Sequence, residues 1–428
     1  MERRKILLLL LLMSLSFPVV SQSTAVRLDP IGEARELAGR EEPLDLESFI
    51  RAAFVFSGTP EERLAKAEAE VRTHITALRA ELNAAEAAAA EPRERAEAAL
   101  AYMHQKLLKY YDERQTALDV LLDRGGYNCV SSGVVYAILI KSLDLEIWGV
   151  RTADHAFCRV QAGDQAFDVE TTSPFGFDPG TRKEFTDNFG RITGYSYVPP
   201  SNYWDRRDIG ERELLALILF NRTAFASERR DYLGAVPPAV DAYALLRDDE
   251  SYERLITSLL NLASWHGMGG RFGEALDFLD RASEGYANDR LDSLREDLVH
   301  NWTVSLIQRR SYSEAEKLLD VQRSGGVIAE KEWKELIVYL YQVRAQETAP
   351  GDYAEAARLI RDGLNKVGSD QGLNRSYEVY IHNSVVNLAR ARRYQEALSV
   401  LDEALSRLPG SSVLLKDRSM VLEASARQ

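Results

Sequence analysis

The spacing of hydrophobic and polar residues changes character twice along the chain. From about 44 to 108 the pattern is helical: "LDLESFIRAAFVF" is apolar on one face, and the stretch after it is rich in Ala, Glu and Arg. Short strand-like runs and turns follow, as far as about residue 200. Beyond about 211 the pattern is helical again. The predicted fold class is α+β, with an all-α C-terminal part.

Two strand-like runs, "HAFCRVQ" and "AFDVETT", flank "AGDQ" and predict a β-hairpin. A tight turn at Gly163 and Asp164 places His155 opposite Thr172, with residues 168 and 170 on the same face. The segment 173–204 that follows is loop-rich and aromatic. It either covers a cleft or is a solvated connector between domains.

A four-residue motif, an aromatic followed by any residue, Glu and Ala, recurs in the C-terminal part at intervals of 40 or 41 residues. A polar amide residue stands eleven positions before each copy. This period is typical of stacked helix-turn-helix units, in which the small Ala allows close packing. The motifs begin at Phe272, Tyr312, Tyr353 and Tyr394, with a degenerate copy at Tyr232, and the amides are Asn221, Asn261, Asn301, Gln342 and Asn383.

This pattern resembles the tetratricopeptide repeat over residues 211–428, with "SSVLLKDRSMVLEASAR" as a terminal capping helix. The resemblance implies a solenoid whose concave groove binds a protein or peptide partner. The alternative is that the repeats brace the preceding domain.

The length of the chain indicates how many domains it has, and its charge excludes some classes of partner. The 428 residues are enough for two or three domains, and 53 Lys and Arg against 66 Asp and Glu give a net charge of −13. That balance argues against a nucleic-acid partner, because binding to a phosphate backbone relies on Lys and Arg. No glycine-rich phosphate loop or metal-ligand spacing is found, so we expect no cofactor and no metal.

The first 23 residues read as a signal peptide, with a basic start, an apolar run from Ile6 and small residues near Ser21. The protein is therefore expected to be exported, to the periplasm or the cell exterior, and to have no membrane span once the signal is cleaved. An uncleaved anchor is the alternative.

Cys129 follows the turn Gly125-Gly126 and begins a segment that is apolar nearly all round, which predicts a buried helix. The positive end of a helix favours a thiolate over a thiol, so this position suits a nucleophile. The alternatives are an inert core thiol and a disulfide with Cys158. Cys158 stands three residues after His155, so we expect it on the opposite strand face, pointing away from Cys129 into the core.

A thiolate nucleophile needs a nearby base, and the base needs a partner that fixes its tautomer. His155 in "DHAFCRV" supplies a base, and "FDVETT" offers Asp168 and Glu170. In the hairpin, Glu170 lies nearer to the position opposite His155, which favours it. A shifted register or a bulge gives the role to Asp168.

Residues from about 110 to 175, with "NCVSSGVVYAILIKSL", "HAF" and "DVETT", resemble the transglutaminase-like superfamily. The resemblance implies a papain-like core, a Cys-bearing helix packed on an antiparallel sheet, with Cys129 as nucleophile and His155 as general base. A gapless match to its Asp-x-Thr pattern selects Glu170, a departure from aspartate. The backbone N–H of Cys129 is one oxyanion donor, and Tyr127 and Asn128 are candidates for the second.

These inferences divide the chain into a signal peptide (1–23), an N-terminal helical region (24–110), a catalytic core with its covering loop (111–210) and helical repeats (211–428). The leading hypothesis is an exported thiol acyl-transfer enzyme, similar to cysteine peptidases and transglutaminases. It cleaves an amide or isopeptide bond or crosslinks two chains, and its repeats hold a protein or peptide. The alternative is an inactive scaffold for protein-protein interaction.

Overall fold

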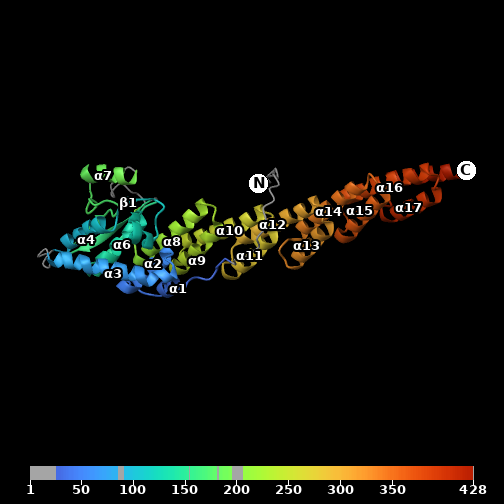
Figure 1. Ribbon diagram of the computed structural model, residues 1–428. Helices are drawn as coiled ribbons and strands as arrows, with labels where there is room; N and C mark the ends of the chain where they lie inside the picture. The colour runs from blue at the N-terminus through green and yellow to red at the C-terminus, as the bar shows by residue number, and fades with distance from the viewer. Residues whose placement is uncertain (1–25, 85–90, 154, 181–182, 195–205, 428) are drawn as a thin grey trace.

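The molecule is elongated, with a compact N-terminal part followed by a rod of paired helices (Figure 1). The predicted signal segment lies outside the described residues. The described part is mostly helical with a small antiparallel sheet, as the α+β class requires. The computed structural model describes residues 26–84, 91–153, 155–180, 183–194 and 206–427.

Four of the described helices precede β1, the first short strand, and three of them lie in the region from about 44 to 108 that the hydrophobic pattern predicts to be helical. The second is capped by the Asp45 side chain, which accepts a hydrogen bond from the backbone N–H of Ser48. The fourth begins at a proline. Proline lacks a backbone N–H, and this costs nothing in the first turn, where N–H groups have no acceptor within the helix. The helices are α1 (Gly32–Ala38), α2 (Leu46–Ser57), α3 (Glu61–Ala84) and α4 (Pro92–Lys106).

The central helix is α6 (Cys129–Ser142), which follows α5 (Leu118–Arg124). It is buried on nearly all sides, as its apolar sequence predicts. Asn128 and Ser131 form a reciprocal capping box that fixes where the helix begins. Cys129 therefore occupies the first helical position.

Among the described residues, four antiparallel strands form one sheet in the order β5-β4-β3-β6, and β4 packs on α6. A short parallel pair, β1 with β2, leads into α6. The strands are β1 (Tyr110–Tyr111), β2 (Gly126–Tyr127), β3 (Ile147–Arg151), β4 (Ala156–Ala162), β5 (Gln165–Val169) and β6 (Arg207–Ile209).

The hairpin of β4 and β5 has the predicted register, from Ala162 opposite Gln165 to Cys158 opposite Val169. The expected opposition of His155 and Thr172 is wrong, however, because the chain turns back after β5. The backbone N–H of Glu170 donates to the carbonyl of Gly176, at 2.8 Å. This turn requires glycine, since a Cβ at Gly176 would lie 1.9 Å from the carbonyl oxygen of Glu170.

Cys158 is a buried free thiol, so the two cysteines form no disulfide. Its expected direction is wrong. The thiol faces α6 and lies 3.5 Å from the carbonyl oxygen of Gly133, one turn beyond Cys129. His155 nevertheless reaches the start of the same helix because it lies just before β4, outside the alternation of the strand.

The predicted loop-rich segment contains a helix, α7 (Lys183–Thr193), which lies apart from the other helices at one end of the molecule (Figure 1). Phe185 and Phe189 on one face of α7 are buried. The packing of this face agrees with a segment that covers a cleft rather than with a solvated connector.

From α8 onward the chain forms consecutive contacting helices, and every second one begins at an aromatic residue of the repeated motif. The Ala three positions after each of these aromatics is buried. The helices are α8 (Glu211–Glu228), α9 (Tyr232–Leu246), α10 (Asp249–Met268), α11 (Phe272–Gly285), α12 (Asp289–Gln308), α13 (Tyr312–Ser324), α14 (Glu330–Thr348), α15 (Tyr353–Val367), α16 (Gln371–Arg390), α17 (Tyr394–Arg407) and α18 (Ser412–Ala426).

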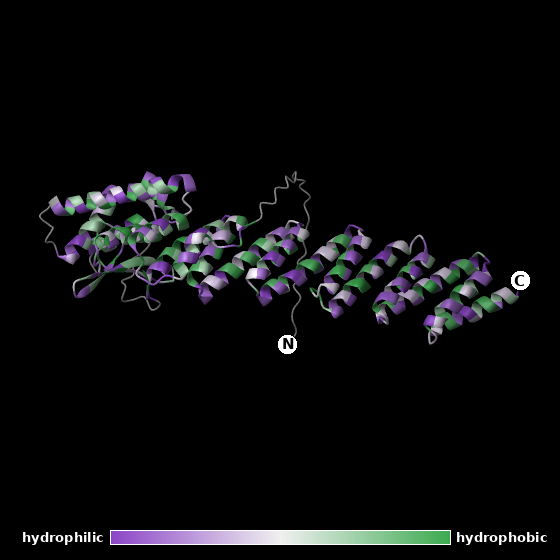
Figure 2. Cartoon of the chain, turned by 90° about the horizontal axis from the view of Figure 1, so that it is seen from below, coloured by the Kyte–Doolittle hydropathy of each residue, from purple (hydrophilic) through white to green (hydrophobic). Residues whose placement is uncertain are grey.

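Two hydrophobic cores meet within α9, not at the predicted boundary of 211. Leu215 and Ile218 of α8 belong to the core around α6, together with Leu245 at the end of α9. Val236 and Val240 of α9 belong to the core of the later helices. Apolar residues, green in Figure 2, accordingly recur along the whole row of helices. The N-terminal helices likewise share the core of α6, so 24–110 and 111–210 are not separate packing units.

Candidate active site

Cys129 stands at the N-terminus of α6, where the backbone N–H groups of the first turn point outward. Its side chain is half-buried at the edge of the core. The imidazole of His155 and the side chain of Cys129 are hydrogen-bonded to each other. The structure thus brings together the two residues that the sequence proposes as nucleophile and base.

His155 is held on its other side by Glu170. Its Nε2 lies 2.6 Å from Oε2 of Glu170, which leaves Nδ1 as the ring nitrogen available to Cys129. The Glu170 side chain is 3% exposed and that of His155 is 17% exposed. A short contact to a buried carboxylate fixes the Nε2–H tautomer and the orientation of the ring.

The second oxygen of Glu170 is fixed by Thr172, a residue to which the sequence analysis gives no role. Both the backbone N–H and the hydroxyl of Thr172 donate to Oε1, at 3.1 and 2.7 Å. The turn closed by Gly176 places Thr172 where it can do this. The "ETT" sequence contained the signal, because a hydroxyl two residues after an acid can bond back to it.

Asp168, the alternative acid, is engaged elsewhere. Arg206 binds it through two nitrogens at 2.7 and 2.8 Å, and Arg159 donates to it at 2.9 Å. These guanidinium groups outweigh the effect of burial and lower the pKa of Asp168. The structure therefore pairs His155 with Glu170 and not with Asp168.

The side chains of Tyr127 and Asn128 are both committed to structural contacts. The Asn128 amide donates to the Glu113 carbonyl at 3.0 Å and to Thr116 Oγ1 at 2.8 Å. The hydroxyl of Tyr127 donates to the Thr172 carbonyl at 3.1 Å. The structure thus does not support either side chain as the second oxyanion donor, since their donor groups are already used.

Electrostatics favour the protonated form of His155. Burial alone would lower its pKa, but the charge of Glu170 and the hydrogen bonds with Cys129 and Glu170 outweigh it, and the pKa is raised well above its usual value. An imidazolium at this position would sit between an anionic carboxylate and the sulfur. This arrangement stabilises a thiolate through direct charge pairing.

Two aromatic rings enclose His155. Phe157 stacks on the imidazole with ring centres 6.2 Å apart, and Phe189 of α7 meets it edge-on at 6.0 Å. Phe189 lies in the segment that the sequence left as either cover or connector. The α7 helix therefore limits the access of water to His155.

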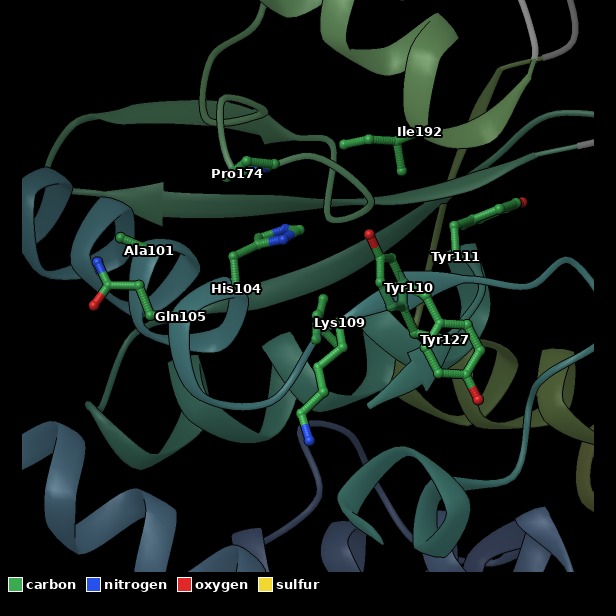
Figure 3. Close-up of a pocket in the computed structure, with 10 residues that line it drawn as sticks. Ala101, His104, Gln105, Lys109, Tyr110, Tyr111, Tyr127, Pro174 and Ile192 are labelled. Carbon is green, nitrogen blue, oxygen red and sulfur yellow. The ribbon is translucent and has the colours of Figure 1, made fainter. Parts of the chain in front are cut away.

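A cavity of about 500 Å³ lies beside this constellation, between the end of α4, β1, β2 and α7. His104, Pro174 and Ile192 surround the space beneath α7 in Figure 3. Tyr127 also lines the cavity and binds the same turn that holds Glu170. No pattern in the sequence indicated the cavity or a role for His104.

His104 is uncharged in this wall. Its Nε2–H donates to the Thr171 carbonyl at 3.1 Å. Burial outweighs that bond and the charge of Glu170, and lowers the pKa of His104 from 6.5 to about 4. Burial likewise raises the pKa of Tyr127 to about 12. His104 and Tyr127 are therefore both uncharged at physiological pH.

No known protein family matches the chain, and no curated protein is significantly similar to it in sequence. Within the residues that the structure describes, no cluster of three or more His, Cys, Asp or Glu side chains could hold a metal ion. None of the described helices is both long and apolar enough to cross a membrane.

Proposed function

We propose that the protein is an exported thiol acyl-transfer enzyme with a transglutaminase-like, papain-like core. The observation that carries this proposal is the arrangement of Cys129, His155 and Glu170, in which the imidazole is hydrogen-bonded both to Cys129 and to a buried carboxylate 2.6 Å away. Such an arrangement suits nucleophilic attack on a carbonyl.

In the first half of the reaction, the Cys129 thiolate attacks the carbonyl carbon of an amide or isopeptide bond. The His155 imidazolium then gives its Nδ1 proton to the departing nitrogen, the C–N bond breaks, and an amine leaves. The product is a thioester between the acyl group and Cys129. Glu170 keeps the imidazole in place through Nε2 and stabilises its positive charge.

In the second half, water or an amine attacks the thioester, and His155 accepts the proton of the incoming nucleophile. The C–S bond breaks and the thiolate is restored. Water gives hydrolysis and an amine gives a new amide crosslink. We favour hydrolysis, because crosslinking also requires a second site for the amine.

Negative charge on the carbonyl oxygen during both steps needs hydrogen-bond donors. The backbone N–H of Cys129 lies in the first turn of α6, where the helix itself offers no acceptor. We propose this N–H as one oxyanion donor. The tetratricopeptide-like rod from α8 onward is proposed to hold the protein or peptide that carries the reacting bond.

The experiment that tests this proposal uses 4-nitrophenyl acetate as a generic acyl donor on the full chain. The wild type should release nitrophenol in a burst and gain one acetyl group on Cys129, detected by intact mass and peptide mapping. Cys129→Ala should abolish the burst. Cys158→Ala is the matched control, and it should keep the burst because this thiol is buried against Gly133.

His155→Ala tests whether the reactivity of Cys129 depends on the imidazole. This variant should lower the acetylation rate by at least about a hundredfold. Adding monodansylcadaverine distinguishes transfer to an amine from hydrolysis. If Cys129 acetylates no faster than a cysteine in the unfolded chain, the enzyme proposal is wrong, and the protein is better described as a scaffold.

A further inference from the structure

The cavity and the candidate triad lie next to each other beneath α7, and successive residues of that helix contact one and then the other. Phe189 of α7 contacts His155, whereas Ile192, three residues later, lines the cavity. Three residues of an α-helix span about 4.5 Å, so the cavity begins roughly one helical turn away from the imidazole. It opens on the side of Tyr127, two residues before Cys129.

The two halves of a substrate would occupy different sides of the candidate triad. The departing amine must lie over His155, which supplies its proton. The acyl half of the substrate must then extend to the other side of Cys129. The cavity is lined by residues of α4, β1 and β2, and the proposal below assigns this acyl half to it.

The wall of the cavity combines aromatic rings with aliphatic and polar side chains. Tyr111 and His104 each meet Tyr127 edge-on, with ring centres 5.8 and 6.1 Å apart. Aliphatic surface comes from Leu108 and Ile192. None of the described lining residues is an acid, so a cationic side chain would find no countercharge there.

The one cation among the described lining residues, Lys109, is directed away from the space. Figure 3 shows its ammonium group pointing away from Pro174 and Ile192. Its stem instead runs along Gly125, where an added Cβ would lie 2.6 Å from Cγ of Lys109. The cavity therefore offers no charge of either sign to a ligand.

Aromatic surface is also exposed at this end of the molecule. Tyr110 of β1, which lines the cavity, is 48% exposed, and Phe175, next to the lining residue Pro174, is 53% exposed. Exposed rings of this kind beside a cavity gain contact area when a ligand ring enters it.

We propose that this cavity is a specificity site for a large aromatic side chain of the peptide substrate, on the acyl side of the bond that is cleaved. The inference rests on the proposed function for its catalytic meaning, but the binding itself does not need the thiol. Edge-to-face packing of the ligand ring against Tyr110, Tyr111 and His104 supplies the preference for an aromatic group over an aliphatic one.

The first test compares chloromethyl ketones of N-acetylated phenylalanine, alanine and lysine on the full chain. The Cys129 sulfur displaces chloride to form a C–S bond, and intact mass follows the rate, with glutathione as the reference for intrinsic reactivity. We expect the phenylalanine reagent to react at least about tenfold faster than the alanine reagent. A lysine reagent that reacts fastest would overturn the proposal.

Two variants test the site itself. Ala101→Trp fills the cavity and Tyr110→Ser removes part of its wall, and each should bring the phenylalanine-to-alanine ratio below about three. Tyr110→Ser keeps the test valid if the larger side chain at Ala101 prevents folding, because Tyr110 is largely exposed. Tyr339→Ser, an exposed tyrosine in α14, is the matched control and should leave the ratio unchanged.

A second measurement distinguishes failure of this proposal from failure of the enzyme proposal. Saturation-transfer NMR with N-acetylphenylalaninamide on Cys129→Ala does not depend on the thiol. The ligand ring protons should receive saturation, and Ala101→Trp should abolish it. Absence of ring saturation refutes the cavity proposal even if Cys129 is reactive, whereas saturation with an unreactive Cys129 refutes only the enzyme.

Discussion

Glu170 is the residue on which the geometry of the site depends. It receives hydrogen bonds from His155 on one oxygen and from the backbone and hydroxyl of Thr172 on the other. Its burial makes these bonds strong, since water does not compete for them. Asp168 stands two residues before Glu170, in β5, and its carboxylate is instead paired with Arg159 and Arg206.

We therefore expect Glu170→Gln to lower the acetylation rate of Cys129 by at least about tenfold, because the amide can no longer stabilise the imidazolium. Binding of the substrate should change little. Asp168→Asn is the matched control, and pre-steady-state nitrophenol release measures both. A loss confined to Asp168→Asn would reassign the acid.

The raised pKa of His155 also makes stability depend on pH. A group whose pKa is higher in the folded protein than in the unfolded chain, about 6.5 for histidine, adds stability that is fully present below that value. The contribution is lost as pH rises through the pKa of the folded state. Burial lowers that pKa, but the charge of Glu170 and the hydrogen bonds with Cys129 and Glu170 raise it by more.

The free energy of unfolding should therefore fall on going from neutral to alkaline pH, and less so in Glu170→Gln, where the anionic partner is gone. Urea unfolding at a series of pH values measures this. Parallel curves for the two proteins above neutral pH would contradict the assignment of the shift to Glu170.

At the scale of elements, the turns between paired helices share a strained backbone position. The residue two places before the repeated aromatic has a positive φ in four of the turns, at Arg230, Gly270, Arg310 and Arg392. Glycine adopts this conformation without cost, whereas a side chain does not. The same turn geometry thus recurs with the 40- or 41-residue period of the motif, although the residue at the positive-φ position is arginine in three turns and glycine in one.

Arg392→Gly should therefore stabilise the protein by about 0.5 to 1 kcal/mol, the left-handed penalty less the extra entropy of glycine in the unfolded chain. Arg375→Gly, at an exposed position inside α16, is the matched control and should destabilise by about 1 kcal/mol. Urea unfolding compares the two, and a loss of stability in Arg392→Gly would refute the strain argument.

At the scale of the whole molecule, the segment before α1 ties the compact part to the rod. Arg27 donates to both oxygens of Asp241 in α9, at 2.8 and 2.6 Å, and the N–H of Ile31 donates to the same carboxylate. The carbonyl of Leu28 accepts a hydrogen bond from the hydroxyl of Tyr286. These contacts meet where the two hydrophobic cores join.

Asp241→Ala should destabilise the protein by about 2 to 4 kcal/mol, because the carboxylate is 3% exposed and its loss leaves Arg27 without its partner. Limited proteolysis should also become faster near residue 30. Asp29→Ala breaks an exposed pair with Arg35 and should cost less than about 0.5 kcal/mol. Equal effects in both variants would mean that the segment does not join the two parts.

The sequence by itself determined the features that depend on near neighbours. The start of α6 at Cys129 follows from the Asn128 cap, the hairpin register from its two-residue turn, and the helix starts from a motif that recurs every 40 or 41 residues. Each is set by backbone preferences and side-chain periodicity within about one element.

The tertiary structure alone decided which distant groups meet. The turn closed by Gly176 moved Thr172 away from the predicted register and onto Glu170. Cys158 faces α6, and α8 belongs to the first core, because burial is optimised over the whole molecule and not along one strand or helix. The contact of Cys158 with Gly133, 25 residues away, depends on that packing, about which the local pattern carries no information.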